Sequence, residues 1–230
     1  MKKEKKSWSL FWKNKGKNEC FDPVALIGYD KAINVSKKNF VNQIIETVKL
    51  KLKLSSSDEF LEVGCGAGML LIPLSKITKT ACGVDLSLSL VNKLRKVHPE
   101  LKLFLAEANN LPFEDQPYDK VLVHSVFHYF PSFKYSKEVI FELLRICRKS
   151  GLILIMDIPD VARKKECIKY MSKFHPKKYA DKELQHLFYS KKFFEEIFYT
   201  QNLKYEIFDQ NIIGYSNSGF RFNVLIKNKF

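Results

Sequence analysis

Long apolar runs are the first feature that this 230-residue sequence lacks. None approaches the roughly 20 consecutive apolar residues that a membrane-spanning helix needs. The N-terminus is basic, but it has no apolar segment of the kind found in secretory signals. Both absences predict a cytoplasmic protein without a transmembrane segment, and the length predicts one domain with a sizeable core.

Cysteine is scarce and scattered. No two cysteines have C-x-x-C spacing, so the sequence predicts neither a zinc site nor a disulfide framework, and we expect no metal. The five are Cys20, Cys65, Cys82, Cys147 and Cys167. Cys65 stands between two glycines, where a small side chain is needed, and we interpret it as a packing residue and not as a nucleophile.

Arginine is also scarce, although the net charge is +14. A charge of this size is typical of proteins that bind nucleic acid, an anionic membrane surface or an acidic substrate. However, specific phosphate recognition usually favours the planar fork of arginine, and here the basic residues are overwhelmingly lysine. The sequence is rich in Phe, Ile and Asn as well, so we attribute most of the charge to the bias of an AT-rich genome.

Glycine is infrequent, yet three of the nine glycines fall within five positions, at Gly64, Gly66 and Gly68. The apolar run 59–63 predicts a strand that leads into this glycine loop, and the spacing predicts a helix over about 67–77. Glycine permits a tight turn and lets a ligand lie against bare backbone. A helix N-terminus adds unpaired N–H groups. The stretch therefore predicts a ligand site, with a purely structural turn as the alternative.

Two acidic residues accompany the loop. Asp85 ends the next apolar run, at about the distance from the glycines where dinucleotide-binding folds grip a ribose diol. A carboxylate there can accept both hydroxyl protons, although Asp85 could instead cap the following helix. Glu62 lies inside the first strand, where a buried charge needs a partner, so it belongs either to the site or to the framework.

These stretches resemble the class I S-adenosylmethionine-dependent methyltransferases. The resemblance rests on LEVGCGAG at 61–68, on GVDLS at 83–87, and on AEANNLPF at 106–113 followed by YDKVLV at 118–123. The elements occur in the order and at the spacings of that family. It implies a Rossmann-like α/β fold, with a mostly parallel seven-stranded sheet, helices on both faces and the last strand antiparallel beside the fifth.

The hydrophobic pattern agrees with such a fold, because apolar runs alternate with helical periodicity, which is typical of parallel sheets. We expect strands at about 59–63, 80–84, 102–105, 120–124, 152–157, 204–208 and 222–226. We expect helices at about 35–54, 67–77, 87–97 and 136–147, a short one from Pro23, and one capped by Ser190.

The domain organisation follows from the same pattern. Residues 35–230 are expected to form the methyltransferase domain. The basic and aromatic segment 1–34 is expected to be a lid or docked helix, with a membrane-surface anchor as the alternative. The stretch 159–187 departs from the alternation and is predicted to be a cap over the substrate.

The resemblance implies S-adenosyl-L-methionine as cofactor and assigns residues to it. The glycine loop would pass under the methionine part and ribose, with a strand acid orienting it and a second acid holding the ribose hydroxyls. A third acid would lie near the adenine. The expected cofactor-binding residues are Glu62, Gly64, Cys65, Gly66, Gly68, Asp85, Leu86, Glu107, Ala108, Asn109, His124 and Ser125.

Two residues are candidates for catalysis. His128 follows the fourth strand, at a position that often faces the transferred methyl in this family, and an imidazole has a suitable pKa for a general base. Tyr29 is the second candidate, because an N-terminal tyrosine often closes over the active site of small-molecule members. For both residues, simple packing is the alternative.

The absence of two motifs reduces the number of acceptor classes that the sequence is compatible with. No Asn/Asp-Pro-Pro-aromatic sequence and no Pro-Cys pair follows the fourth strand, which argues against methylation of DNA bases. The leading hypothesis is methyl transfer to O or N of a small molecule, including an anionic one that the lysines of 159–187 could bind. RNA or ribosome-associated methylation and a non-catalytic cofactor-binding scaffold subunit are the alternatives.

Overall fold

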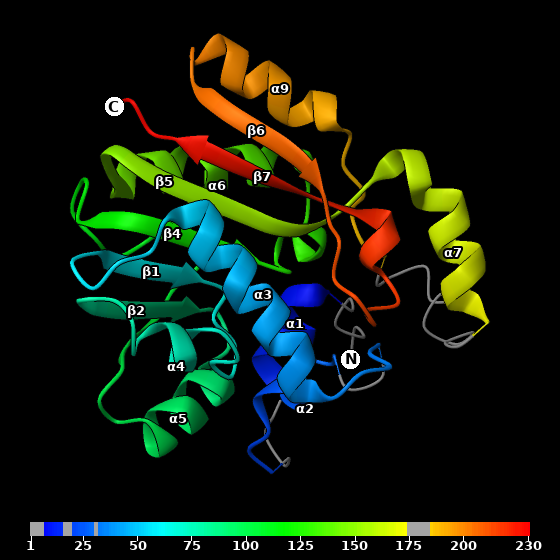
Figure 1. The fold of residues 1–230 in the computed structure, drawn as a ribbon, viewed down its shortest axis with the longest axis horizontal. Coiled ribbons are helices and arrows are strands. Elements are labelled where there is room, and N and C mark those ends of the chain that lie inside the picture. Colours follow the sequence, from blue (N-terminus) through cyan, green and yellow to red (C-terminus); the bar gives the residue numbers. More distant parts are fainter. Residues whose placement is uncertain (1–6, 16–19, 30–31, 174–184) are drawn as a thin grey trace, which may run out of the picture.

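The computed structural model describes residues 7–15, 20–29, 32–173 and 185–230. In these residues one seven-stranded sheet has the order β3-β2-β1-β4-β5-β7-β6 (Figure 1). The strands are β1 Glu59–Val63, β2 Thr80–Asp85, β3 Lys102–Leu105, β4 Tyr118–His124, β5 Cys147–Pro159, β6 Lys204–Asp209 and β7 Arg221–Lys227. Strands β1 to β5 pair in parallel, and β7 lies antiparallel between β5 and β6. The predicted fold, including the antiparallel last strand beside the fifth, is confirmed.

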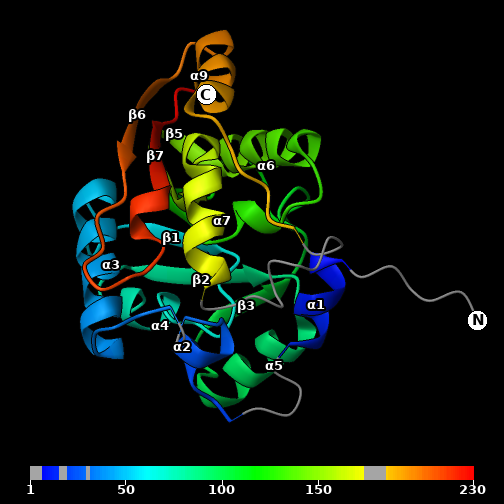
Figure 2. The ribbon, with the colours of Figure 1, turned by 90° about the vertical axis from the view of Figure 1, so that its right-hand side faces the viewer.

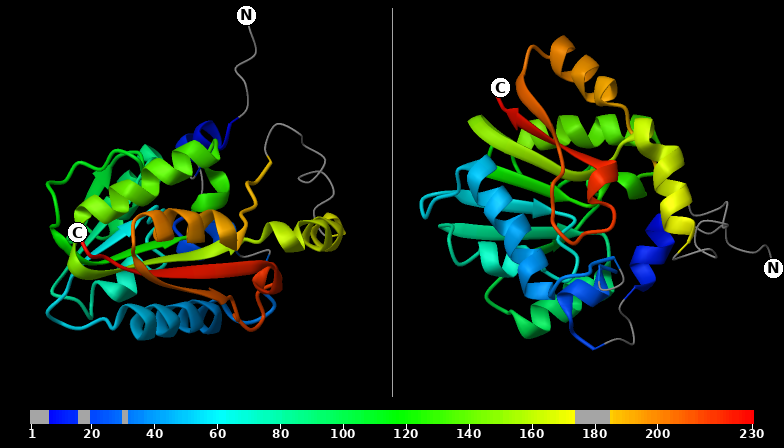
Figure 3. Two further views of the ribbon diagram at one scale, coloured as in Figure 1. Left: turned by 90° about the horizontal axis from the view of Figure 1, so that it is seen from above. Right: turned by 45° about the vertical axis from the view of Figure 1, so that its right-hand side comes forward.

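Helices cover both faces of the sheet, as Figure 3 shows for α3 and α6. They are α1 Trp8–Asn14, α2 Pro23–Leu26, α3 Lys37–Leu52, α4 Leu71–Leu74, α5 Leu88–Val97, α6 Phe133–Ile146, α7 Lys164–Ser172 and α9 Lys191–Thr200. Strand residues alternate between two cores: Leu61 and Val121 pack with α6 and α9, while Phe60 and Leu122 pack with α3, α4 and α5. Among the described residues no helix has the length and apolar character needed to cross a bilayer.

Capping side chains set where the main helices begin. Ser36, Ser87, Ser132 and Ser190 each accept a hydrogen bond from the backbone N–H three residues later, at the starts of α3, α5, α6 and α9. Asp22 caps α2 in the same way, with a proline at the first helical position. The helix starts predicted at Pro23 and after Ser190 are therefore confirmed.

The helix predicted over 67–77 is wrong in length, because only α4 is helical there. Gly66 and Gly68 have φ angles of 52° and 82°, so the chain is still turning in the left-handed region at residue 68. Pro73 has no N–H with which to extend the helical ladder. The loop itself, and not the end of a long helix, presents backbone groups to the site.

Two neighbouring strands end in the same unusual backbone conformation. Ser125 follows β4 with φ 59°, and Asp157 near the end of β5 has φ 62°. The N–H of Ser125 donates to the carbonyl of Met156 at 3.1 Å, which ties the two ends together. Figure 2 looks onto this edge of the sheet, where α1, α2 and α7 gather. Open α/β sheets bind their ligands at this edge.

Candidate functional site

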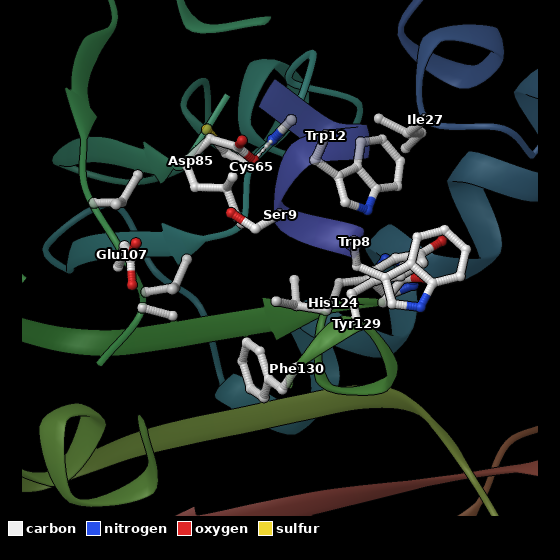
Figure 4. Close-up of a pocket in the computed structure, with 18 of the residues that line it drawn as sticks. Trp8, Ser9, Trp12, Ile27, Cys65, Asp85, Glu107, His124, Tyr129 and Phe130 are labelled. Carbon is white, nitrogen blue, oxygen red and sulfur yellow. Dashed lines mark hydrogen bonds between the residues drawn. The ribbon is translucent and has the colours of Figure 1, made fainter. Parts of the chain in front are cut away.

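A cavity of about 430 Å³ opens at the carboxyl ends of β1, β2 and β4 (Figure 4). Its walls come from the glycine loop, the ends of these three strands, residues 106–108, helix α1 and residues 185 and 187. The cavity is therefore lined both by the sequence motifs at 61–68, 83–87 and 106–113 and by two segments far from them in the chain, α1 and residues 185 and 187.

Most of the residues predicted for the site line this cavity. They are Tyr29, Glu62, Gly64, Cys65, Gly66, Asp85, Leu86, Glu107, Ala108, His124 and Ser125. Three predicted residues do not line it: Gly68, Asn109 and His128. The three acids expected at the cofactor are thus brought together in one cavity, and one of the two catalytic candidates is not.

The glycines of the loop lie against different side chains. A Cβ on Gly64 would lie 2.3 Å from Cγ2 of Val126, so this position needs glycine for the close approach of the segment after β4. A Cβ on Gly68 would lie 2.8 Å from Cδ1 of Leu94 in α5. Gly68 therefore fits the structural alternative, a turn packed against a helix, while Gly64 and Gly66 both border the cavity.

Asp85 holds the glycine loop and faces the cavity. Its Oδ2 accepts from the N–H of Gly66 at 2.8 Å, and its Oδ1 accepts from the N–H of Ser87 at 2.8 Å. Ser87 caps α5, so the alternative in which Asp85 is the cap is wrong. Burial raises the pKa of the Asp85 carboxyl, although both N–H groups favour the charged form. A carboxylate has about four acceptor positions, so further donors can bind here.

Glu62 carries a buried acceptor without a partner. Its side chain is 3% exposed, and no described residue donates to Oε2. Burial raises the pKa of the carboxyl well above its usual value, and the nearby charge of Asp85 adds to this. A buried orphan acceptor at a cavity wall is costly unless a ligand supplies the donor. Glu62 is therefore suited to an ammonium group.

The third acid, Glu107, lies opposite Tyr135. Burial and the charge of Glu107 raise the pKa of Tyr135 to about 12, so the phenol is a hydrogen-bond donor at neutral pH. Asn109 points elsewhere, because its Nδ2 donates to Glu138 at 3.1 Å. The structure thus adds Tyr135 to the residues lining this end of the cavity and places Asn109 outside it.

Tyr29 closes the opposite end of the cavity. It is 5% exposed, and its hydroxyl donates to Oδ2 of Asp157 at 3.1 Å. Burial and the charge of Asp157 raise the pKa of Tyr29 well above 10. Arg221 pairs with the same carboxylate, with 3.3 Å between Nε and Oδ1. This ion pair comes from β5 and β7, and no motif of the sequence pointed to it.

His124, the last residue of β4, and His128, four residues later, have different environments. His124 lines the cavity, and burial lowers its pKa below the usual value. His128 lies in a short 3-10 turn, Phe127–Tyr129, with its ring 3.9 Å from that of Tyr129 and 4.7 Å from that of His186. Its carbonyl accepts from the N–H of Leu187 at 3.0 Å, so this turn anchors a lining segment.

An aromatic wall completes the cavity; the sequence predicted the segment 1–34 as a lid, but it did not single out these aromatic residues as site residues. Trp8 and Trp12 of α1 line it with Tyr129 and Phe130. Nε1 of Trp8 donates to the carbonyl of Gln185 at 3.0 Å, and the rings of Trp8 and Tyr129 lie 4.8 Å apart. The only signal in the sequence was the cluster of aromatic residues near the N-terminus. Among the described residues, no Lys or Arg lines the cavity.

Within residues 7–15, 20–29, 32–173 and 185–230, no group of three or more His, Cys, Asp or Glu is arranged to hold a metal ion.

Comparison with known families and curated proteins supports one assignment. Residues 61–155 match a family model described as a methyltransferase domain. The phthiotriol/phenolphthiotriol dimycocerosates methyltransferase 1 of Mycobacterium ulcerans is 32% identical over 107 residues, covering 45% of this chain and 38% of that protein. The demethylmenaquinone methyltransferase of Staphylococcus saprophyticus is 27% identical over 155 residues, covering 64% and 65%. The chain thus spans less than two thirds of these curated relatives.

Solved structures share the fold over nearly the whole chain. An S-adenosylmethionine-dependent methyltransferase from Clostridium acetobutylicum superposes with a TM-score of 0.66 and 17% identity, covering 92% of this chain and 100% of that one. At this identity the likeness concerns the fold. The family assignment rests on the motif-bearing region 61–155 together with the complete seven-stranded sheet.

Proposed function

Since this chain belongs to the class I S-adenosylmethionine-dependent methyltransferase family, we propose that it binds S-adenosyl-L-methionine and transfers the methyl group to O or N of a small molecule. The observation that carries the proposal is the buried Oε2 of Glu62, to which no described residue donates, beside Asp85 in the wall of the cavity. Methyl transfer needs little more than a nucleophile positioned behind the sulfonium, which already has a good leaving group.

The residues present fit this cofactor. Glu62 would accept from its ammonium group, Asp85 would accept from its ribose hydroxyls, and the glycine loop would run beneath both. Glu107 and Tyr135 would face the adenine. The cofactor carries a sulfonium and an ammonium, so a wall with three carboxylates and no described Lys or Arg supports binding of a cation.

The other end of the cavity indicates which class of acceptor molecule it could bind. Aromatic rings and uncharged polar groups form it, and its histidine, His124, has a lowered pKa. An uncharged acceptor fits this wall better than an anionic one, because a buried anion would need a cationic partner. The lysines of the cap that we expected to bind an anion include Lys177 and Lys178, which lie outside the described residues.

Two segments outside the matched family region would enclose the acceptor. Helix α1 contributes Ser7, Trp8, Ser9 and Trp12 to the lining, and the end of the segment 159–187 contributes Gln185 and Leu187. These contacts support the proposal that the N-terminal segment is a lid and that 159–187 is a substrate cap. A hydrogen bond between Trp8 and Gln185 joins the two.

Two measurements test the proposal. Calorimetry with S-adenosylmethionine and S-adenosylhomocysteine should show saturable binding of one molecule per chain, in the micromolar range. Incubation with methyl-labelled cofactor and a small-molecule extract of cells should then transfer label to low-mass products. Absence of binding would contradict the cofactor assignment. Binding with label found only on RNA would contradict the small-molecule acceptor and favour the RNA alternative.

A further inference from the structure

Two histidines lie near the end of β4, His124 as its last residue and His128 four positions later, and of these two His124 borders the cavity. His124 is 7% exposed and lines it, with its ring centre 5.9 Å from that of Tyr29. His128, four residues later, does not line it and stacks with Tyr129 and His186 instead. The tight bend at Ser125, with φ 59°, separates the two environments.

We propose that His124 is the general base, which accepts the proton of an O–H or N–H acceptor as the methyl group moves. The inference rests on the proposed function. In the step, a lone pair of the acceptor atom forms the new bond to the methyl carbon, and the carbon–sulfur bond breaks with its electron pair left on sulfur. The acceptor proton passes to a ring nitrogen of His124, which becomes an imidazolium.

The environment of His124 leaves it able to accept a proton. None of the described residues forms a hydrogen bond with either ring nitrogen, so one lone pair is available to the cavity. Burial lowers the pKa of the imidazole, and the neutral form therefore dominates at pH 7. A base must be unprotonated at the working pH and must border the space that the acceptor would occupy, and His124 has a lowered pKa and lines the cavity.

Two other titratable lining residues, Tyr29 and Cys65, are poor bases. The phenol of Tyr29 has a pKa well above 10, and its proton is already donated to Asp157. The thiol of Cys65 also has a pKa well above its usual value, because it is buried beside Asp85 and Glu62. These two carboxyls lie at the cofactor end. Among the described lining residues, His124 is therefore the one imidazole, and its lowered pKa keeps it neutral at pH 7.

A buried carboxylate behind His124 would stabilise the imidazolium once it forms. The charge of Asp157 acts to raise the pKa of His124, against the larger effect of burial. Asp157 is 1% exposed and is held by Tyr29, by Nε2 of Gln210 at 3.1 Å and by the guanidinium of Arg221. Tyr215 donates to it as well, at 3.3 Å.

These neighbours determine the balance of charge around His124. Tyr29 and Tyr215 both have strongly raised pKa values, so they stay neutral at working pH. Arg221 offsets part of the charge of Asp157, which explains why burial prevails and the resting imidazole is neutral. The left-handed φ of 62° at Asp157 is an uncommon backbone conformation that this hydrogen-bond network maintains.

Nuclear magnetic resonance can test the resting state without knowledge of the acceptor. The chain has five histidines, and His124→Gln would assign the signal of His124 in labelled protein loaded with S-adenosylhomocysteine. We expect this signal to titrate below the unperturbed value of about 6.5. A His124 that titrates above pH 7 would be charged in the resting enzyme and would overturn the proposal.

Label transfer from methyl-labelled cofactor to the small-molecule extract tests the catalytic step. We expect His124→Gln to lower the initial rate by about 10²–10⁴-fold and to abolish the rise of rate with pH. Its affinity for S-adenosylhomocysteine should stay within about threefold of wild type. His98→Gln is the matched control, because His98 pairs with Glu100 and is not among the lining residues.

The outcomes separate this inference from the proposed function. Failure of the wild type to bind S-adenosylhomocysteine or to transfer label would contradict the proposed function itself. Normal label transfer by His124→Gln, or a larger loss in His128→Gln than in His124→Gln, would overturn His124 as the base. Equal losses of rate and of cofactor affinity in His124→Gln would show that it only supports the site.

Discussion

The two ends of the cavity differ in charge and in construction. The end that we assign to the cofactor has three carboxyls, Glu62, Asp85 and Glu107, carried by two strands and a short loop of the parallel sheet. The acceptor end is aromatic and uncharged, and it combines α1, the turn at 127–129 and residues 185 and 187. One end is a fixed part of the sheet, and the other is assembled from segments distant in sequence.

This difference indicates that cofactor binding and acceptor choice are carried by different parts of the chain. The cofactor end lies within the region that matches the family, 61–155, whereas α1 and residues 185 and 187 lie outside it. A sheet edge that always binds the same ligand can be built locally. The choice of acceptor can then change through the outer segments without disturbing the sheet, as expected for a fold that carries many activities.

The largest effect should follow from filling the cofactor end with a side chain. Gly66→Val should abolish binding of S-adenosylhomocysteine, with a loss beyond about 100-fold, because φ is 52° there and an added Cβ would lie 2.9 Å from Ile27. Calorimetry measures the loss, and circular dichroism checks the fold. Gly219→Val is the control, because a Cβ at Gly219 meets nothing within 4 Å. Tight binding by Gly66→Val would place the cofactor elsewhere.

Removing the Asp85 carboxylate should have the next largest effect. Asp85→Ala should weaken S-adenosylmethionine binding by about 1.5–3 kcal/mol, the usual cost of losing hydrogen bonds to a charged group. Titration calorimetry of variant and wild type measures it. Asp209→Ala removes an exposed acid that pairs with Lys191 and should leave affinity unchanged. Equal affinities in Asp85→Ala and wild type would remove Asp85 from the site.

The sequence predicted the cofactor end of the cavity better than the acceptor end. The glycine loop, Asp85 and Glu107 could be predicted because their chemistry lies in short motifs with fixed spacing. Helix 67–77 was predicted too long, since periodicity alone does not register three left-handed glycines. The contacts of Trp8 with Gln185 and of Tyr29 with Asp157 join residues more than 100 positions apart, and a single sequence carries no local signal for such pairs.

A substitution at Glu62 should change the stability of the protein and its affinity for the cofactor in opposite directions. The pKa of the Glu62 carboxyl is higher in the folded protein than in the unfolded chain, where it is about 4.3. At pH values between these two pKa values, the folded protein binds more protons than the unfolded chain. Stability therefore falls as pH rises through that window. Glu62→Gln should stabilise the ligand-free protein by about 1 kcal/mol at pH 7.5, by removing a buried unsatisfied charge, and should give no gain near pH 4.

Urea unfolding at the two pH values measures the gain, and calorimetry of the same variant should show weaker S-adenosylmethionine binding. Stability and affinity would thus change in opposite directions, as expected for a residue retained for its ligand. A variant that loses stability at pH 7.5 would indicate that the hydrogen bond from the backbone N–H of Leu71 to Glu62 stabilises the fold by more than the unsatisfied oxygen costs, and that the place of Glu62 in the site is secondary.

The smallest effect should come from the acceptor end, where Trp8 links the lid to the cap. Trp8→Phe keeps a ring against Tyr129 but loses the hydrogen bond to Gln185, which is worth about 0.5–1.5 kcal/mol. If α1 closes the cavity over the bound cofactor as well as over the acceptor, S-adenosylhomocysteine should dissociate roughly 2- to 10-fold faster. Trp8 and Trp12 are the two tryptophans of the chain and both line the cavity, so stopped-flow fluorescence of Trp12 reports the release. Tyr199→Phe, at an 85% exposed position on α9, is the matched control. An unchanged dissociation rate in Trp8→Phe would show that α1 is a static wall, and the acceptor end would then be as rigid as the cofactor end.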